Sequence, residues 1–324
     1  MWRLKHILLL VAFALLAKGS FCWGFYAHQK INYYAVFLLP PQMLLFYKPN
    51  ILFLSEHAVA PDKRRYAVAD EAPRHNIDLD VYRHLPLDSL PRRWDSAVAK
   101  LSEDTLHKHG IVPWWVQGMQ YRLTEAFKEK NGALILKLSA EIGHYIADAH
   151  VPLHASSNYN GQQTGQHGIH GFWESRLPEL LAQKEWNFFI GKATYIPSTM
   201  DFIWQRVLES AAAADTVLQV EKDLSKAFPP DQKYAFENRN GMVVRQYSTA
   251  YSKAYNTALN GMVERRMQQS ILAIASFWMT AWINAGQPDL STLTKTTFTE
   301  SDLKEFEELN KAWRSNKVQG RAHE

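Results

Sequence analysis

The stretch from 141 to 174 constrains the fold most, because it gathers histidines and carboxylates at helical spacing in a short length of chain. It reads E-I-G-H-Y-I-A-D-A-H-V-P-L-H, then a polar loop, then H-G-I-H-G-F-W-E. His144 and Asp148 are four residues apart in an apolar helical pattern, so both side chains project from one face of a helix. Pro152 ends that helix, and His154 follows in the turn.

A second pair, His170 and Glu174, repeats the four-residue spacing at the start of the next helical segment. A lone histidine on a helix usually packs in the core or lies in solvent, but this combination of pairs is typical of a metal site. Imidazole and carboxylate ligands together suit zinc best among the common ions, although iron and manganese accept the same ligand types. The stretch therefore predicts a metal centre held between two helices.

The rest of the chain predicts a single all-α domain. Apolar residues at helical spacing predict helices over 27–38, 51–59, 113–130, 132–149, 199–228, 241–259 and 262–285. No segment shows a convincing β-strand alternation. A chain of 324 residues with 47% hydrophobic content can bury a large core, and no linker interrupts it. We expect the helical domain to span 23–299, followed over 300–324 by a charged amphipathic helix and a basic tail in solvent.

The first 22 residues are expected to be a secretory signal peptide. Arg3 and Lys5 precede an apolar run over 7–16, which is shorter than a membrane span. An uncleaved membrane anchor is the alternative. Cleavage after Cys22 would export the protein to the periplasm or the cell exterior and remove its only cysteine, so packing and metal would have to replace disulfides. Lipid attachment at Cys22 is disfavoured, because bulky Phe21 stands where lipoprotein signals have a small residue.

The net charge argues against one class of binding surface. Of the 36 basic residues, Arg3, Lys5 and Lys18 precede position 23, which leaves 33 basic residues against 32 acidic ones. A protein of this charge has no broad basic surface with which to attract nucleic acid. Any affinity for phosphate must therefore come from the site itself.

Five short motifs lie between residues 23 and 174. They are W-G-x3-H (Trp23, Gly24, His28), D-x-x-R (Asp62, Arg65), R-H-x-I-D (Arg74, His75, Ile77, Asp78), H-x3-D-x-H-x-P-L-H (His144, Asp148, His150, Pro152, Leu153, His154) and H-x3-[DE] (His170, Glu174). Together they resemble the zinc-dependent phospholipase C and single-strand-specific nuclease family, whose members are mostly helical and hold three zinc ions in one cleft. The helices beyond 174 match this family only in general character.

The resemblance implies a cleft with three zinc ions held by nine residues. The second ion would keep positions open for water, and the free amino group and carbonyl of Trp23 would chelate the third, so signal cleavage would be a condition of activity. The implied ligands are Asp62, His75, His144 and Asp148 for the first ion; His154, His170 and Glu174 for the second; and Trp23, His28 and the bridging Asp148 for the third.

The expected chemistry is attack of water on the phosphorus of a phosphodiester substrate. Zinc in such a centre lowers the pKa of water towards about 7 and neutralises charge on phosphate oxygens. Asp62 and Asp148 are the candidate catalytic carboxylates, and whether Asp62 is the general base or only orients the water stays open. Asp70 also precedes His75, but Asp62 is favoured because Arg65 follows it at the family spacing.

Four further side chains have two interpretations each. His150 and His167 either donate hydrogen bonds behind the metal ligands or lie in solvated loops. Arg65 and Arg74 either contact phosphate or pair with carboxylates. Sequence alone leaves both alternatives open.

Features of the two family branches disagree about the substrate. The five-residue step from Trp23 to His28 and the presence of His150 resemble the nucleases, whereas Glu174 and the lack of cysteine pairs resemble the phospholipases. We expect nuclease or 3'-nucleotidase activity on single-stranded nucleic acid or nucleotides. The alternatives are phospholipase C-type hydrolysis of phospholipid head groups, and a helical protein that binds zinc without catalysis.

Overall fold

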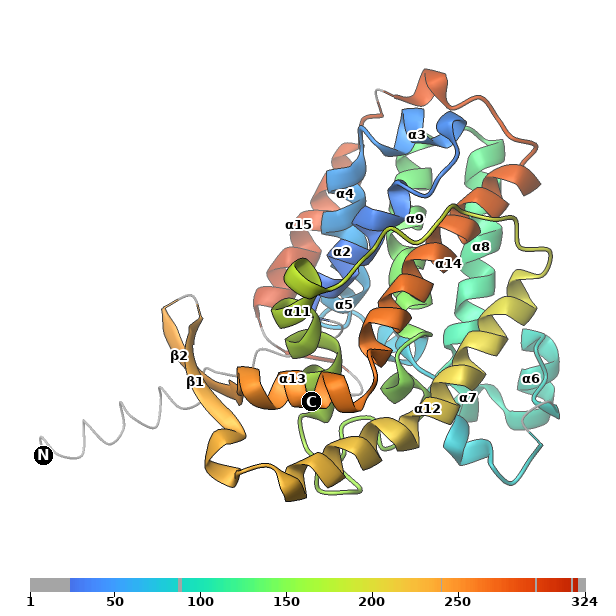
Figure 1. The fold of residues 1–324 in the computed structure, drawn as a ribbon. Coiled ribbons are helices and arrows are strands. Elements are labelled where there is room, and N and C mark those ends of the chain that lie inside the picture. The colour runs from blue at the N-terminus through green and yellow to red at the C-terminus, as the bar shows by residue number, and fades with distance from the viewer. Residues whose placement is uncertain (1–23, 87–88, 240, 295, 316, 320–324) are drawn as a thin grey trace, which may run out of the picture.

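Helices build most of the described chain, which in the computed structural model comprises residues 24–86, 89–239, 241–294, 296–315 and 317–319 (Figure 1). The α-helices are α2 Phe25–Val36, α3 Pro41–Tyr47, α4 Ile51–Glu56, α5 Ala60–Arg64, α6 Trp94–Leu101, α7 Glu103–His109, α8 Val112–Lys128, α9 Gly132–Asp148, α10 Ile169–Gly171, α11 Leu177–Glu185, α12 Thr199–Ala227, α13 Thr249–Ala258, α14 Met262–Asn284 and α15 Glu300–Arg314. Shorter turns are η1 His57–Val59, η2 Ala69–His75, η3 Leu79–Tyr82, η5 Pro152–Ala155, the π-helical η6 Phe172–Arg176, η7 Pro230–Gln232 and η8 Ser291–Leu293. The predicted all-α single domain is confirmed.

Helix α9 lies at the centre of the body and carries part of the predicted site. It begins where the Asn131 side chain accepts a hydrogen bond from the Leu134 N–H at 3.1 Å, and it ends at Asp148, ahead of Pro152. Most of its length is buried against α2, α4, α8 and α14. Burial of that apolar surface stabilises a helix that holds His144 and Asp148 inside the protein.

Helices α2 and α9 approach each other closely at one polar contact. Asn32 on α2 is buried, and its Nδ2 donates to the backbone oxygens of Leu54 and Ala140 at 3.1 and 3.0 Å. Gly143 on α9 faces this amide, and a Cβ at that position would lie 2.2 Å from Asn32 Oδ1. His28 stands about one helical turn before Asn32, so the contact places His28 against the site face of α9.

The hairpin of β1 and β2 corrects the sequence-based prediction. The predicted helix over 241–259 is wrong in its first part, because β1 Tyr234–Arg239 and β2 Met242–Tyr247 pair antiparallel there. Gly241 has the positive φ of +83° that a tight hairpin turn favours, and α13 begins only after its capping residue Ser248. Strands of six residues are too short for periodicity alone to separate them from the start of a helix.

The outer helices enclose this centre. Each of the other predicted helices is present with its ends shifted by no more than two residues, except that α4 stops at Glu56 and the turn η1 continues to Val59. Helix α12 runs against α8, η5 and α13, and the Ser198 side chain caps it by accepting from the Asp201 N–H at 3.2 Å. Helix α15 lies along α5 instead of standing in solvent, since Lys63 Nζ donates to Asn310 Oδ1 at 2.8 Å. Among the described helices, none combines the length and the apolar character that crossing a membrane takes.

Candidate metal centre

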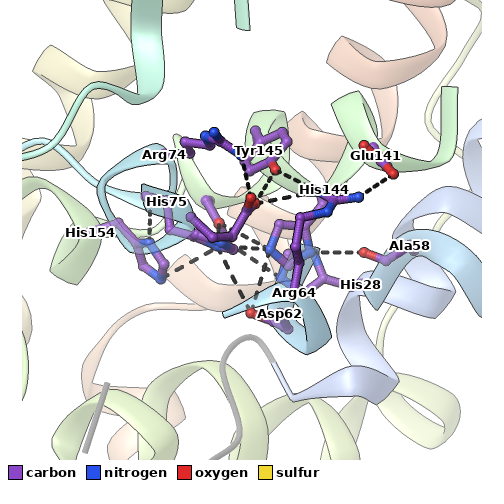
Figure 2. A network of polar contacts seen from close by, with 12 residues as sticks. His28, Ala58, Asp62, Arg64, Arg74, His75, Glu141, His144, Tyr145 and His154 are labelled. Atoms are coloured by element: carbon purple, nitrogen blue, oxygen red, sulfur yellow. Dashed lines mark hydrogen bonds and ion pairs between the residues drawn. The ribbon is translucent and has the colours of Figure 1, made fainter. Parts of the chain in front are cut away.

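Eight of the nine predicted ligands lie in the described part of the chain, and the fold brings them together from seven helical segments. Figure 2 shows several of them turned toward one point. All eight are buried: His28 on α2, Asp62 on α5, His75 on η2, His144 and Asp148 on α9, His154 on η5, His170 on α10 and Glu174 on η6. Trp23, the ninth, lies outside the described residues. The next residue, Gly24, is held beside the site, because its N–H donates to the Glu174 carbonyl oxygen at 3.3 Å.

One oxygen of Asp148, Oδ2, faces two histidines. It lies 3.0 Å from His75 Nδ1 and 3.3 Å from His144 Nε2. Asp62 completes this group, with its Oδ1 3.6 Å from His144 Nε2 and 3.9 Å from His75 Nδ1. The four-residue spacing on α9 therefore directs His144 and Asp148 to the same place, together with two side chains from the segment 62–75.

The other oxygen of Asp148, Oδ1, faces the remaining groups. It lies 3.4 Å from His28 Nε2 and 3.9 Å from His154 Nε2. The His28 ring also stacks on the His144 ring, with centroids 3.8 Å apart, as a result of the close approach of α2 and α9. Asp148 thus lies between side chains of all three predicted metal sites.

A separate group forms around Glu174. His154 Nε2 lies 3.3 Å from Glu174 Oε2, and His170 Nε2 lies 3.1 Å from Glu174 Oε1. Glu174 belongs to the π-helical turn η6, and turns of this kind are frequent at functional sites. One carboxylate therefore lies between two imidazoles that come from either side of the polar loop.

Backbone carbonyls fix the orientation of three of these rings. The Nδ1 atoms of His144, His154 and His170 lie within hydrogen-bond distance of the carbonyl oxygens of Ala58, His75 and Tyr159, at 2.8, 2.6 and 3.0 Å. A ring that donates through Nδ1 presents its Nε2 lone pair to the opposite side. In each of the three, Nε2 faces the carboxylates, which is the orientation that a metal ligand needs.

His75 is oriented in the opposite sense, by a residue that the sequence reasoning missed. Its Nδ1 faces Asp148, while its Nε2 lies 3.6 Å from Oε1 of the fully buried Glu71. Burial alone raises the pKa of Glu71, but the facing His75 and Arg64 outweigh burial and lower it to about 2. Tyr145 also donates a hydrogen bond to Glu71. Glu71 stands four residues before His75, the same spacing that identified the other pairs, and this signal was available in the sequence.

The surroundings shift pKa values in opposite directions within the cluster. Burial alone raises the pKa of Asp148, but facing His144 and His154 outweigh it and hold it well below its ordinary value. Burial lowers the pKa of His144, yet Asp148 and Asp62 outweigh that effect and raise it to about 9. For Glu174, burial dominates over the opposing effect of His154 beside it and raises the pKa to about 8. The protein groups thus favour added positive charge beside these carboxylates, which protons or metal ions can supply.

The separations and the hydrogen bonding fit metal binding. A tetrahedral ion bonded at about 2.1 Å holds its ligand atoms about 3.4 Å apart. The N–O separations of 3.0 to 3.9 Å lie around that value. Both oxygens of Asp62, Oδ1 of Asp148 and Oε1 of Glu174 are buried and accept no hydrogen bond within the described residues, which is costly for carboxylates without a cation. Three buried groups could hold metal ions: His28, His144 and Asp148; Asp62, His75 and His144; and His154, His170 and Glu174.

The structure also shows where the three other candidate side chains near Asp62 lie. Asp70 is exposed, so Asp62 is the carboxylate that reaches the cluster. Arg74 pairs with Glu71 at 2.5 Å. Of the two predicted roles, phosphate contact and pairing with a carboxylate, the structure shows the second. Arg65 is buried, and its carbonyl oxygen accepts the Gln319 N–H at 2.9 Å, so the chain beyond α15 contacts the segment that follows Asp62.

The two extra histidines of the central stretch differ. His167 is exposed in the polar loop. His150 is fully buried and has its Nδ1 2.7 Å from the Ile146 carbonyl oxygen, so it is not a solvated loop residue. Neither belongs to the three metal-capable groups.

Comparison of the chain with known protein families, curated proteins and solved structures gives no match.

Proposed function

We propose that this protein is an exported, zinc-dependent phosphoester hydrolase of the phospholipase C and single-strand nuclease type. The observation that carries the proposal is the position of Asp148 between the histidines of three buried groups able to hold metal ions. Zinc is proposed because mixed imidazole and carboxylate ligands at tetrahedral spacing suit it best. The apolar N-terminal run supports export.

The described residues have distinct proposed roles. Bound zinc would polarise a phosphate oxygen and activate water for attack on phosphorus. Asp62 would orient that water and take its proton on a carboxylate oxygen, since neither oxygen accepts a hydrogen bond within the described ranges. Burial raises the pKa of Asp62, but His144 and His28 outweigh burial and lower it, so the carboxylate is ionised at neutral pH. Asp148 would join the groups and hold their spacing.

Metal analysis of the exported protein, joined to a hydrolysis assay, tests this proposal. We expect two or three bound zinc ions and chelator-sensitive hydrolysis of a generic phosphodiester such as bis(p-nitrophenyl) phosphate. Bound zinc without any hydrolysis would support the non-catalytic zinc-binding alternative instead. Fewer than two zinc ions and no hydrolysis would overturn the proposal.

The proposed substrate is single-stranded nucleic acid or a 3'-nucleotide, on the branch features of the sequence. Phospholipid is the second candidate, and one structural observation favours it: a hairpin with Phe236 and Val243 exposed adjoins the segment that carries Glu174. Rates on single-stranded DNA, a 3'-nucleotide and phosphatidylcholine, measured on one preparation, separate the two. Turnover of the lipid alone would reverse the proposed order.

A further inference from the structure

The hairpin of β1 and β2 projects from the helical body (Figure 1). In its register Phe236 pairs with Arg245 and Asn238 pairs with Val243, so these four side chains share one face. All four are exposed, Phe236 to 74% and Val243 to 70%. We call these four residues the hairpin surface. Met242, which pairs with Arg239 on the other face at the start of β2, is also 56% exposed.

The opposite face of the hairpin is attached to the body. Arg176 on η6 donates to both carboxylate oxygens of Glu237, at 3.1 and 2.6 Å. Arg239 pairs with Glu179 on α11. Because η6 also carries Glu174, the hairpin is tied to the same short segment as the metal-capable group. Its exposed face therefore has a defined orientation relative to the candidate centre.

One cation of the hairpin is left over after its ion pairs are counted. Of the three basic residues in the segment 233–247, Lys233 pairs with Glu221 and Arg239 with Glu179, and its one acid, Glu237, pairs with Arg176. Arg245 lies with its guanidinium 3.7 Å from the centre of the Tyr234 ring and forms no ion pair within the described residues. The hairpin surface thus combines an unneutralised cation with exposed apolar side chains.

We propose that the hairpin surface docks on a phospholipid bilayer that contains anionic lipids. Projecting apolar side chains would enter the interface while Arg245 meets lipid phosphates, which is the usual composition of interfacial protein segments. Single-stranded nucleic acid fits less well because its bases stack on exposed rings. Of the three rings on this face only Phe236 is exposed, whereas Tyr234 and Tyr247 are half-buried. The docking does not depend on the proposed hydrolase activity. Docking would orient η6 toward the membrane, which would support phospholipid, the second candidate substrate.

Co-sedimentation of the full exported chain with vesicles tests the docking. We expect binding to vesicles of mixed phosphatidylglycerol and phosphatidylcholine, and weaker binding to phosphatidylcholine alone. The double variant Phe236→Ser/Val243→Ser should reduce partition onto the mixed vesicles about tenfold, since two apolar side chains leave the interface. Arg245→Gln should reduce the preference for anionic vesicles about fivefold. Lipid composition is checked after sedimentation so that turnover does not mimic weak binding.

Leu52→Ser is the matched control, since Leu52 is 66% exposed on α4 and should leave binding unchanged. Circular dichroism should show native helix content in every variant, because the changed side chains are exposed. No vesicle binding by the unaltered protein, or equal binding by the double variant, would overturn the docking. So would binding to a single-stranded oligonucleotide, lost in the double variant, in the absence of vesicle binding. Since none of these measurements requires zinc or turnover, failure here is distinguishable from failure of the hydrolase proposal.

Discussion

His144 and His150 lie six residues apart near the end of α9, and both are fully buried, yet their pKa values move in opposite directions. Burial lowers both, but Asp148 and Asp62 beside His144 raise its pKa to about 9. Around His150 burial prevails, and the pKa falls to about 3 despite the hydrogen bond to the Ile146 carbonyl. The first histidine belongs to a metal-capable group and the second does not.

His57 repeats the second behaviour elsewhere in the molecule. Its ring stacks on Phe53 with centroids 3.9 Å apart and contacts Phe306 of α15. Burial, together with a smaller effect of nearby Lys63, lowers its pKa to about 4 in spite of the hydrogen bond to the Phe53 carbonyl. Burial of a histidine therefore does not mark a metal-capable group here. The facing carboxylates do, and without them the pKa of His144 should fall as that of His150 does.

The largest expected effect is that of Asp148→Asn. This change removes the charge that His28, His75 and His144 share, so bound zinc should fall by two ions and hydrolysis by at least about 10³-fold. Native mass spectrometry measures the first and a steady-state assay the second. His150→Gln, two residues away and equally buried, is the matched control and should keep all bound metal. If the two variants lose the same number of ions, the distinction drawn between His144 and His150 is wrong.

Glu174→Gln should have a smaller and more local effect. It leaves His154 and His170 without their shared carboxylate, so one zinc ion should be lost while the ions around Asp148 remain. Metal content per protein measures this directly. The control is Glu185→Gln on α11, which removes only a surface pair with Lys253. Loss of every ion in Glu174→Gln would show that the groups do not load separately.

Glu71→Gln tests whether the carboxylate that faces the far side of His75 contributes to zinc affinity. We expect zinc affinity to fall about 10- to 100-fold, because His75 loses the group that orients its Nε2 side. Competition with a chromogenic chelator gives the affinity. Glu141→Gln is the matched control, because Glu141 also pairs with Arg64 but contacts none of the proposed ligands in the described structure. Equal affinities in the two variants would restrict the role of Glu71 to stability.

The smallest expected effect concerns His57 and pH. Its pKa of about 4 in the fold lies below the ordinary value of 6.5, so the unfolded chain takes up the proton first as pH falls. This group should therefore reduce the free energy of unfolding as pH falls from about 6.5 to about 4. The expected loss is about 1–2 kcal/mol, less than the roughly 3 kcal/mol of the full pKa difference, because the ring is only partly buried and solvent screens it. His57→Phe keeps the stack and should remove that part of the pH dependence in urea titrations. His167→Phe, on an exposed histidine, should not change the profile.

The spacing of residues within one helical segment could be predicted from the sequence. The His144 to Asp148 interval and the helix boundaries could be read from the sequence, because each depends on the period of one helix. The contact between Asn32 and Gly143 could not, since it joins two helices far apart in sequence and leaves no local pattern. The hairpin was missed for another reason: a few residues of alternation cannot be told from the beginning of a helix.

The cluster connects His28 to Glu174 across most of the first half of the chain, and this has a kinetic consequence. Closing loops of that length is slow and entropically costly, so the ligands meet late in folding. Ions held by these ligands would bind the native state and not the transition state of folding. They would slow unfolding without speeding folding. In the proposed exported form, which has no cysteine pair, such ions would provide the resistance to unfolding that exported proteins often obtain from disulfides.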